Sequence, residues 1–291
     1  MKKEVLLSIG LALLLLTSCG AEKLPQESQN TEMTPHTQQE SSHSESSKED
    51  LPGKTEQVKA FDSIEVDVLA ADIRVEVGED WSVSYYLSDK EPVKQLGVEG
   101  DTLYVETAFD PTEYYDRTED WFVLVTVPAD TDLADLELET ISGNVGIQDI
   151  VCNTAQLSSI SGRVKVQNVD ARVLDLETAS GKIDVDDATA KRLEAETVSG
   201  NLDISGVFED ADSNTISGRT QYTGSITIEG SIESVSGDVS LTLDHPAEIE
   251  AKSMETITVN GERSKGTVHT GEGIPITIES ISSRIDIETA Q

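Results

Sequence analysis

The sequence predicts an all-β fold in which most of the chain is a parallel β-solenoid, a β-helix-like stack of similar turns. Three observations lead to this prediction: the dipeptide Ser-Gly recurs at a nearly constant spacing, apolar and polar residues alternate between its copies, and long helical patterns are few. The recurring copies, 19, 19, 19, 18 and 19 residues apart, are Ser142-Gly143, Ser161-Gly162, Ser180-Gly181, Ser199-Gly200, Ser217-Gly218 and Ser236-Gly237. Ser205-Gly206 falls out of register, and we interpret it as incidental.

The residues around each Ser-Gly recur as well. Aliphatic side chains stand three residues after the Ser, as in Val145, Val164 and Ile183, and a Ser or Thr stands two residues before it. We expect each repeat to form two short half-buried strands, with a corner at Ser-Gly where Gly adopts positive φ and the preceding Ser or Thr caps the turn. Stacked repeats would pair in parallel, about 4.8 Å apart, and bury their aliphatic columns as one core.

The repeat decays towards both ends, and the composition changes before it begins. We expect a lipoprotein signal peptide at 1–18, a lipid-anchored disordered linker at 19–59, an N-terminal β module or cap at 60–130, and the Ser-Gly repeat solenoid at 131–291. The linker is rich in Gln, Glu, Ser, Thr and Pro and has few large apolar residues, a composition that does not support a packed core.

The first residues resemble a bacterial lipoprotein signal. Lys2 and Lys3 precede an apolar run that is shorter than the roughly 20 residues of a membrane span. The run ends in Leu16, Thr17, Ser18 and Cys19, which resemble the lipobox. This resemblance implies cleavage before Cys19, acylation of Cys19, and a position on the extracytoplasmic face of the cell membrane, where two acyl chains suffice for stable anchoring. The alternative is an ordinary secretory signal with an incidental Cys.

The charge balance limits the partners that the chain can have. The formal net charge is −35, which argues against nucleic acid and anionic lipid and is compatible with cations or basic proteins. Cys152 would be the one remaining cysteine of an acylated chain, so it has no disulfide partner and is expected to be a buried small residue.

No catalytic or cofactor motif stands out. The repeated Ser lacks the strand–turn–helix surroundings of a nucleophile elbow, and His245 and His269 have no metal-ligand spacing around them. We therefore predict no enzyme activity and no cofactor, and read the Ser residues as a structural ladder. A carbohydrate-active enzyme is a less favoured alternative, because some β-solenoids cleave polysaccharides with clustered carboxylates.

Two charged stripes are expected on the solenoid surface. The acidic one comprises Glu137, Glu139, Asp175, Glu177, Glu194, Glu196 and Asp212, and the basic one comprises Arg163, Lys165, Lys182 and Arg219. Ca²⁺ favours several carboxylate oxygens, so Asp175, Glu177, Glu194 and Glu196 are a hypothetical calcium site. The alternative is a solvated acidic face that prevents aggregation.

The repeated pattern Thr-aliphatic-Ser-Gly-x-aliphatic-x-aliphatic resembles the DUF4097 family, also called putative adhesins. The segments Ala71-Asp72-Ile73-Arg74-Val75 and Val125-Thr126-Val127-Pro128 are similar to that family too, and the resemblance covers about residues 60–290. It implies a solenoid architecture and supplies no catalytic residues.

These observations favour a non-enzymatic cell-surface lipoprotein that presents a rigid solenoid to a wall polymer, glycan or protein. Tyr114, Tyr115 and Trp121, if exposed in a row, would favour glycan binding, and Arg163, Lys165 and Lys182 are further candidates for a binding surface. The alternative is an envelope-stress or regulatory lipoprotein that contacts a membrane sensor or transporter. The linker composition favours a Gram-positive host.

Overall fold

The computed structural model describes residues 53–89, 91–108 and 120–290. Contacts divide the chain after Pro52, and the strands described below belong to the unit Gly53–Gln291. Within the described ranges the chain forms nineteen strands and no helix, which confirms the all-β class; it therefore contains no helix that could span a membrane there. The signal peptide and the lipobox predicted above lie outside these ranges.

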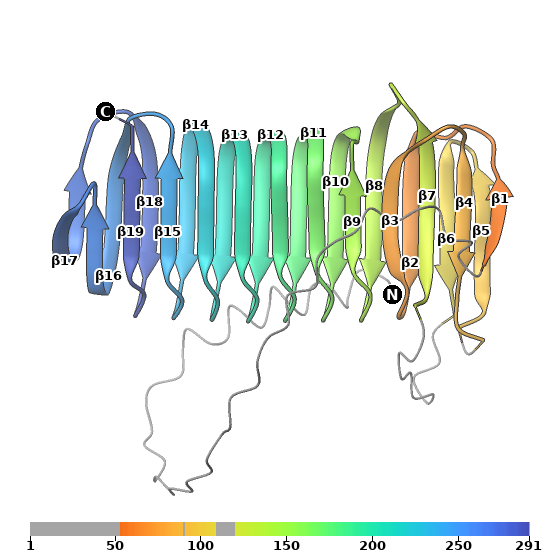
Figure 1. The fold of residues 1–291 in the computed structure, drawn as a ribbon, viewed down its shortest axis with the longest axis horizontal. Coiled ribbons are helices and arrows are strands. Elements are labelled where there is room, and N and C mark those ends of the chain that lie inside the picture. The colour runs from red at the N-terminus through yellow and green to blue at the C-terminus, as the bar shows by residue number, and fades with distance from the viewer. Residues whose placement is uncertain (1–52, 90, 109–119, 291) are drawn as a thin grey trace, which may run out of the picture. The chain divides into compact units, whose positions relative to one another are not determined.

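Five strands form the regular centre of the stack. They are β10 (Val151–Ser159), β11 (Val164–Thr178), β12 (Ile183–Thr197), β13 (Leu202–Thr215) and β14 (Thr220–Ser234). Each pairs in parallel with the next, as Figure 1 shows. The offset is one repeat, so Leu157 pairs with Leu176 and Leu176 with Ala195, all buried. The predicted parallel solenoid is therefore confirmed, and we call each of its turns a rung.

The rungs of β11 to β14 each contain one long strand where two short ones were predicted, whereas the rung before them keeps two short strands, β9 (Val145–Gln148) and β10. β11 and β12 are both 15 residues long. The chain bends at Asn168 in β11 and at Asp187 in β12, where φ is 51° and 54°. Asn and Asp enter this left-handed region more readily than other non-glycine residues, so the chain turns while parallel pairing continues on both sides of the bend.

The Ser-Gly corners need glycine for a different reason from the one predicted. None of the six corner glycines has positive φ. Instead, a Cβ atom on Gly181 would overlap the carbonyl oxygen of Gly162 in the preceding rung, and the same collision recurs from rung to rung. The corner backbones approach one another too closely for any side chain, so the prediction of positive φ was wrong and close packing of the corners replaces it.

A buried hydroxyl caps the first four corners, at Gly143, Gly162, Gly181 and Gly200, as predicted, whereas the Thr215 hydroxyl before Gly218 makes no such bond. Thr178 Oγ1 accepts a hydrogen bond from the Gly181 N–H at 3.0 Å and donates one to the Gly162 carbonyl at 3.2 Å. Ser159 makes the same two contacts one rung earlier, with Gly162 and Gly143. The hydroxyl therefore caps its own turn and also links it to the preceding rung.

Ser205-Gly206 has a structural role, which corrects its interpretation as incidental. Gly206, with φ of 156°, pairs with Ala188, the residue after the bending Asp187, and with Gly224, whose φ is 135°. β13 is consequently 14 residues long, and its register against β12 shifts at this point. This shortened bend accounts for the single 18-residue step in the repeat.

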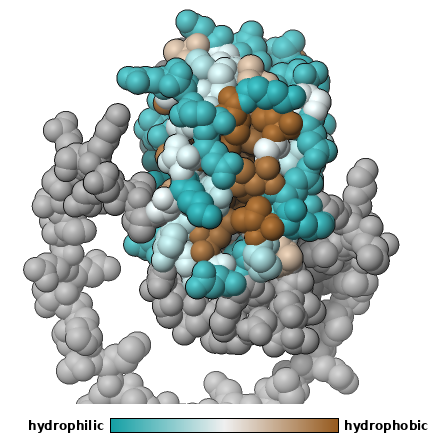
Figure 2. Space-filling model, turned by 90° about the vertical axis from the view of Figure 1, so that its right-hand side faces the viewer, coloured by the Kyte–Doolittle hydropathy of each residue, from teal (hydrophilic) through white to brown (hydrophobic). Residues whose placement is uncertain are grey.

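The N-terminal part continues the parallel stack. Its parallel strands are β2 (Ser63–Val68), β3 (Asp72–Gly78), β6 (Thr102–Thr107), β7 (Phe122–Pro128), β8 (Asp132–Thr140) and β9 (Val145–Gln148). β2 lies between β6 and β8, and β3 lies between β7 and β9. The antiparallel strands β1 (Lys54–Gln57), β4 (Ser82–Tyr86) and β5 (Val93–Glu99) complete this end. Figure 2 shows a band of apolar side chains here between hydrophilic ones.

The C-terminal rungs do not stack in chain order. They comprise β15 (Val239–Leu243), β16 (Ala247–Val259), β18 (Ile274–Ser280) and β19 (Ile285–Thr289). β18 lies between β14 and β16, and β19 lies between β15 and β16. The degenerate rungs predicted here therefore exist, and β17 (Glu262–Thr270) pairs antiparallel with β16 beside them.

Candidate functional site

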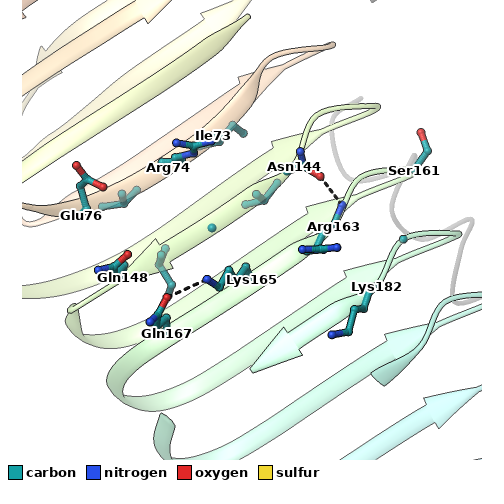
Figure 3. Close-up of a pocket in the computed structure, with 15 residues that line it drawn as sticks. Ile73, Arg74, Glu76, Asn144, Gln148, Ser161, Arg163, Lys165, Gln167 and Lys182 are labelled. Carbon is teal, nitrogen blue, oxygen red and sulfur yellow. Dashed lines mark hydrogen bonds between the residues drawn. The ribbon is translucent and has the colours of Figure 1, made fainter. Parts of the chain in front are cut away.

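The structure brings the three predicted basic residues together with a fourth. Arg163, Lys165 and Lys182 line a surface groove of about 700 Å³ with Arg74 of β3. Glu76 is the one acidic side chain among the described residues that line it. We call this groove the basic notch, and Figure 3 shows its labelled side chains.

A missing side chain creates the notch. Gly146 of β9 pairs with Arg74 on one side and with Lys165 of β11 on the other. Arg74 and Lys165 are therefore two rungs apart, about 9.5 Å at the usual strand spacing. Because Gly146 has only hydrogen between them, the two cationic side chains border an open floor.

The corner beside the notch is fixed by side-chain hydrogen bonds. Asp72 Oδ1 accepts from the Asn144 backbone N–H at 2.7 Å and from Asn144 Nδ2 at 3.1 Å. Asn144 Oδ1 in turn accepts the Arg163 N–H at 2.9 Å. The backbone from which the Arg163 side chain leaves is thus held from the two preceding rungs, so Asp72 and Asn144 are positioning residues.

The four cations differ in how strongly neighbouring groups already bind them. Lys182 Nζ lies 2.8 Å from Asp203 and 3.2 Å from Asp184. Burial opposes its charge, but the hydrogen bonds to these carboxylates outweigh that effect and raise the pKa of Lys182. Lys165 Nζ donates to Gln167 Oε1 at 2.9 Å. The guanidinium groups of Arg74 and Arg163 have no such partner within the described ranges, which leaves both available to a ligand.

The acidic stripe is found where the repeat predicts it, with an interruption. Asp175 pairs with Glu194 and Glu194 with Asp212, while Glu177 pairs with Glu196. We call these five residues the acidic ladder. Gln156 and Ser158 of β10 separate it from Glu137 and Glu139 of β8.

Arg192 compensates part of the acidic ladder. Its guanidinium lies 3.2 Å from Glu194 and 3.6 Å from Asp212. Burial, followed by the charge of Glu196, nevertheless raises the pKa of the Glu177 carboxyl to about 7. In the described part of the chain, no group of three or more His, Cys, Asp or Glu side chains is arranged to hold a metal ion. The ladder thus carries excess negative charge, and the calcium hypothesis gains no support from its geometry.

Trp121 does not belong to an exposed aromatic row. Its side chain is buried at 7% exposure, packed into the core at the start of β7. Sugars stack on exposed ring faces, so Trp121 is unsuited to the glycan contact predicted for it. Tyr114 and Tyr115, like Cys19 and the preceding lipobox residues, lie outside the described residues.

The repeated Ser residues form the expected structural ladder. The hydroxyls of Ser161, Ser180, Ser199 and Ser236 each donate to a carbonyl in the preceding rung, at 3.1 to 3.4 Å. His245 Nε2 instead accepts the Ile226 N–H at 3.1 Å, and His269 lies 3.4 Å from Glu250. The contacts of these hydroxyls and imidazoles are therefore those of structural groups.

Sequence reasoning missed Arg74, Gly146, Asp72 and Asn144. Arg74 lies outside the Ser-Gly repeats, and its neighbour Gly146 follows it by 72 residues. The sequence does contain one signal for Gly146: it is the residue of the first repeat that corresponds to Lys165 and Asp184 in the next two, so a glycine stands where the later repeats have a charged side chain.

A family model described as Toastrack DUF4097 matches residues 61–288. The chain belongs to the DUF4097 family. The Toastrack match spans every described rung from β2 to β18 and includes all the residues of the basic notch. The resemblance seen in the repeat pattern is thereby confirmed. No curated protein matches the chain.

Several solved structures resemble this Toastrack chain in fold. One, named a putative adhesin from Bacteroides fragilis NCTC 9343, shares 14% identity, with a TM-score of 0.44 over 82% of this chain and 96% of that one. Another, named a putative lipid binding protein from Parabacteroides distasonis ATCC 8503, shares 20% identity, with a TM-score of 0.46 over the same fractions. At these values the likeness says nothing about ligands.

Proposed function

We propose that this protein is a non-enzymatic lipoprotein of the bacterial cell surface that binds a macromolecule through the basic notch. Acylation of Cys19 would hold it on the extracytoplasmic face of the membrane, and the linker between Cys19 and β1 would separate the solenoid from the bilayer. The solenoid supplies a rigid surface, since every strand is held by neighbours on the stack.

The basic notch is the observation that carries the proposal. Four cationic side chains converge on one groove in a chain whose net charge is −35. Two of their guanidinium groups have no carboxylate partner among the described residues, and such groups can pair with a charged ligand. The acidic ladder has the character of a solvated face that limits aggregation.

Photo-crosslinking on living cells tests this proposal. A benzophenone amino acid replaces Gln148, whose exposed side chain lines the notch. The matched control carries the same group at Thr242, an exposed residue of β15 at the equivalent position of a later rung. We expect an adduct with an extracytoplasmic glycan or protein from position 148 alone.

The outcomes separate the candidate roles. Equal adducts at both positions, or none at either, would overturn the notch as the contact surface. Recovery of a sensor kinase or transporter from position 148 would favour the regulatory role over adhesion. Recovery of wall polymer, or of a host molecule when host cells are present, would favour the adhesin-like role.

A further inference from the structure

We propose that the basic notch recognises an otherwise uncharged glycan that carries a single isolated oxyanion, either a carboxylate or a phosphate. This inference rests on the proposed function, because it assigns a ligand class to the same surface. The physical basis is the combination of two guanidinium groups that no described carboxylate binds, a narrow positive region and a pair of amide side chains around an open floor.

The guanidinium groups provide the oxyanion contact. Arg74 and Arg163 leave the stack two rungs apart, on β3 and at the corner before β11, and neither is bound to a described carboxylate. A guanidinium presents parallel N–H donors that match the two oxygens of a carboxylate or phosphate. Lys165 lies between Arg163 and Gln167 in Figure 3, and its ammonium group adds a third positive charge to those of the two arginines.

The positive region is too narrow for a polyanion. Along the stack, the column that contains Arg74, Gly146 and Lys165 continues with Asp184 and Asp203. A second anionic group one or two rungs farther along a ligand would therefore face carboxylates. The net charge of −35 adds long-range repulsion of any densely charged chain. A ligand with one anion avoids both penalties.

Two amide side chains at the other end of the notch, next to the Glu76 carboxylate, match sugar hydroxyls. Gln148 and Gln167 are paired in register and lie beside each other in Figure 3. Gln167 uses its carbonyl oxygen to accept from Lys165, which leaves its NH₂ as a donor. Gln148 uses its NH₂ on Asp149, which leaves its carbonyl as an acceptor. A hydroxyl group both donates and accepts, so this pair suits a polyhydroxylated chain.

Gly146 makes the notch possible and also offers a way to close it. A Cβ atom there would meet its nearest neighbour, the Lys165 carbonyl oxygen, at 3.4 Å, and the backbone has no strained φ. A larger residue at this position is therefore compatible with the fold and would fill the floor between Arg74 and Lys165. Gln221 is its counterpart in β14, on the same column and exposed.

Binding of glycans grouped by charge tests the inference with the full-length chain in detergent. The probes are oligosaccharides that are uncharged, carry one carboxylate, carry one phosphate monoester, or carry repeated phosphates. We expect binding of singly charged probes, about ten- to hundredfold weaker in the Arg74→Gln, Arg163→Gln double variant. The preference between the carboxylate and phosphate probes identifies the source of the oxyanion. Gly146→Leu should weaken binding at least tenfold, while the matched Gln221→Leu leaves it unchanged.

Three results would overturn the inference: equal affinity for uncharged probes, stronger binding of the repeated phosphates, or no glycan binding at all. Thermal melting of each variant confirms that a loss of binding is not a loss of fold. If no glycan binds but position 148 crosslinks a protein on cells, the ligand class is wrong and the proposed function stands. If position 148 forms no adduct either, both fail.

Discussion

Asn144 holds Arg163 in place across one rung, because its side-chain oxygen accepts the Arg163 backbone N–H at 2.9 Å. The same link joins Asn201 to Arg219 at 2.9 Å and Asp238 to Arg284 at 3.2 Å. A short polar residue after the Ser-Gly corner thus fixes the backbone of the cationic residue in the next rung. Structural support and placement of charge come from the same hydrogen bond.

Replacing Asn144 by Ala should therefore affect both stability and binding. We expect a loss of about 0.5–1.5 kcal/mol in the free energy of unfolding, the typical contribution of such hydrogen bonds, and weaker binding at the notch. Asn201→Ala is the matched control, since it removes the same link away from the notch. It should show a stability loss in urea unfolding that is no larger, because Asn144 also donates from Nδ2 to Asp72, and the ligand affinity should be unchanged. Equal losses of affinity in both variants would contradict a positioning role for Asn144.

Two glycine substitutions should have opposite effects on stability. Gly181→Ala forces a methyl group into the Gly162 carbonyl, so we expect a cost of about 3 kcal/mol or more. Gly146→Ala has room for its methyl group and should stabilise the strand by about 0.5 kcal/mol. Urea unfolding of both variants measures the difference. Similar changes in the free energy of unfolding for the two variants would mean that close approach of the corner backbones is not the reason for glycine there.

The buried hydroxyls allow a matched comparison at constant side-chain volume. Thr178→Val removes a group that both donates and accepts, and should destabilise the fold by about 1–3 kcal/mol. Thr220 is equally buried, but its hydroxyl has no hydrogen-bond partner. Thr220→Val should consequently be neutral or slightly stabilising. Calorimetric melting distinguishes the two, and an equal loss in both would refute the capping role of Thr178.

The acidic ladder should make stability depend on pH near neutrality. The folded pKa of Glu177, about 7, is above the ordinary glutamate value of 4.5, so the folded state binds the proton more tightly than the unfolded state does. This contribution is complete below pH 4.5 and is lost as the pH rises towards 7. We expect the melting temperature to fall between pH 5 and about pH 7.5, and Glu177→Gln to flatten that fall. Glu233→Gln, at an exposed site, should leave the slope intact.

The proposed anchoring would depend on one side chain, that of Cys19. Cys19→Ala removes the thiol that we propose is acylated, so the protein should move from the membrane fraction to the culture medium or the soluble envelope fraction. Cys152→Ala is the control, because Cys152 is buried and desolvation raises the pKa of its thiol to about 12. Membrane retention of the Cys19 variant would contradict lipid anchoring.

The repeat was predictable because periodicity reports on stacking directly. Columns such as Leu157, Leu176 and Ala195 align only if each repeat pairs with the next at a constant offset. The reason for glycine at the corners was harder to predict, because glycine is equally suited to a positive φ and to a close approach of two backbones. The roles of Gly181 and Gly206 are thus distinguished by the neighbouring backbone, which the sequence does not show.

The basic notch was half predictable for a related reason. Arg163 and Lys165 belong to one repeat and Lys182 to the next, so their proximity follows from the period. Arg74 joins them through the pairing of β3 with β9, which no repeat encodes. The prediction that Trp121 is exposed was wrong because an aromatic residue near a polar loop gives the same sequence pattern whether its ring packs inward or outward.

The placement of β18 and β19 between earlier strands separates the order of synthesis from the order in space. β18 pairs with β14 on one side, as at Gly230 and Ile276, and with β16 on the other. β14 and β16 are therefore joined only after β18, which is synthesised later than both, has taken its position between them. This end therefore cannot grow by simple accretion of successive turns, and its closure is a non-local, comparatively slow event. A nascent chain that stops short of Ile274 would expose two unpaired strand edges facing each other, a conspicuous target for chaperones and proteases.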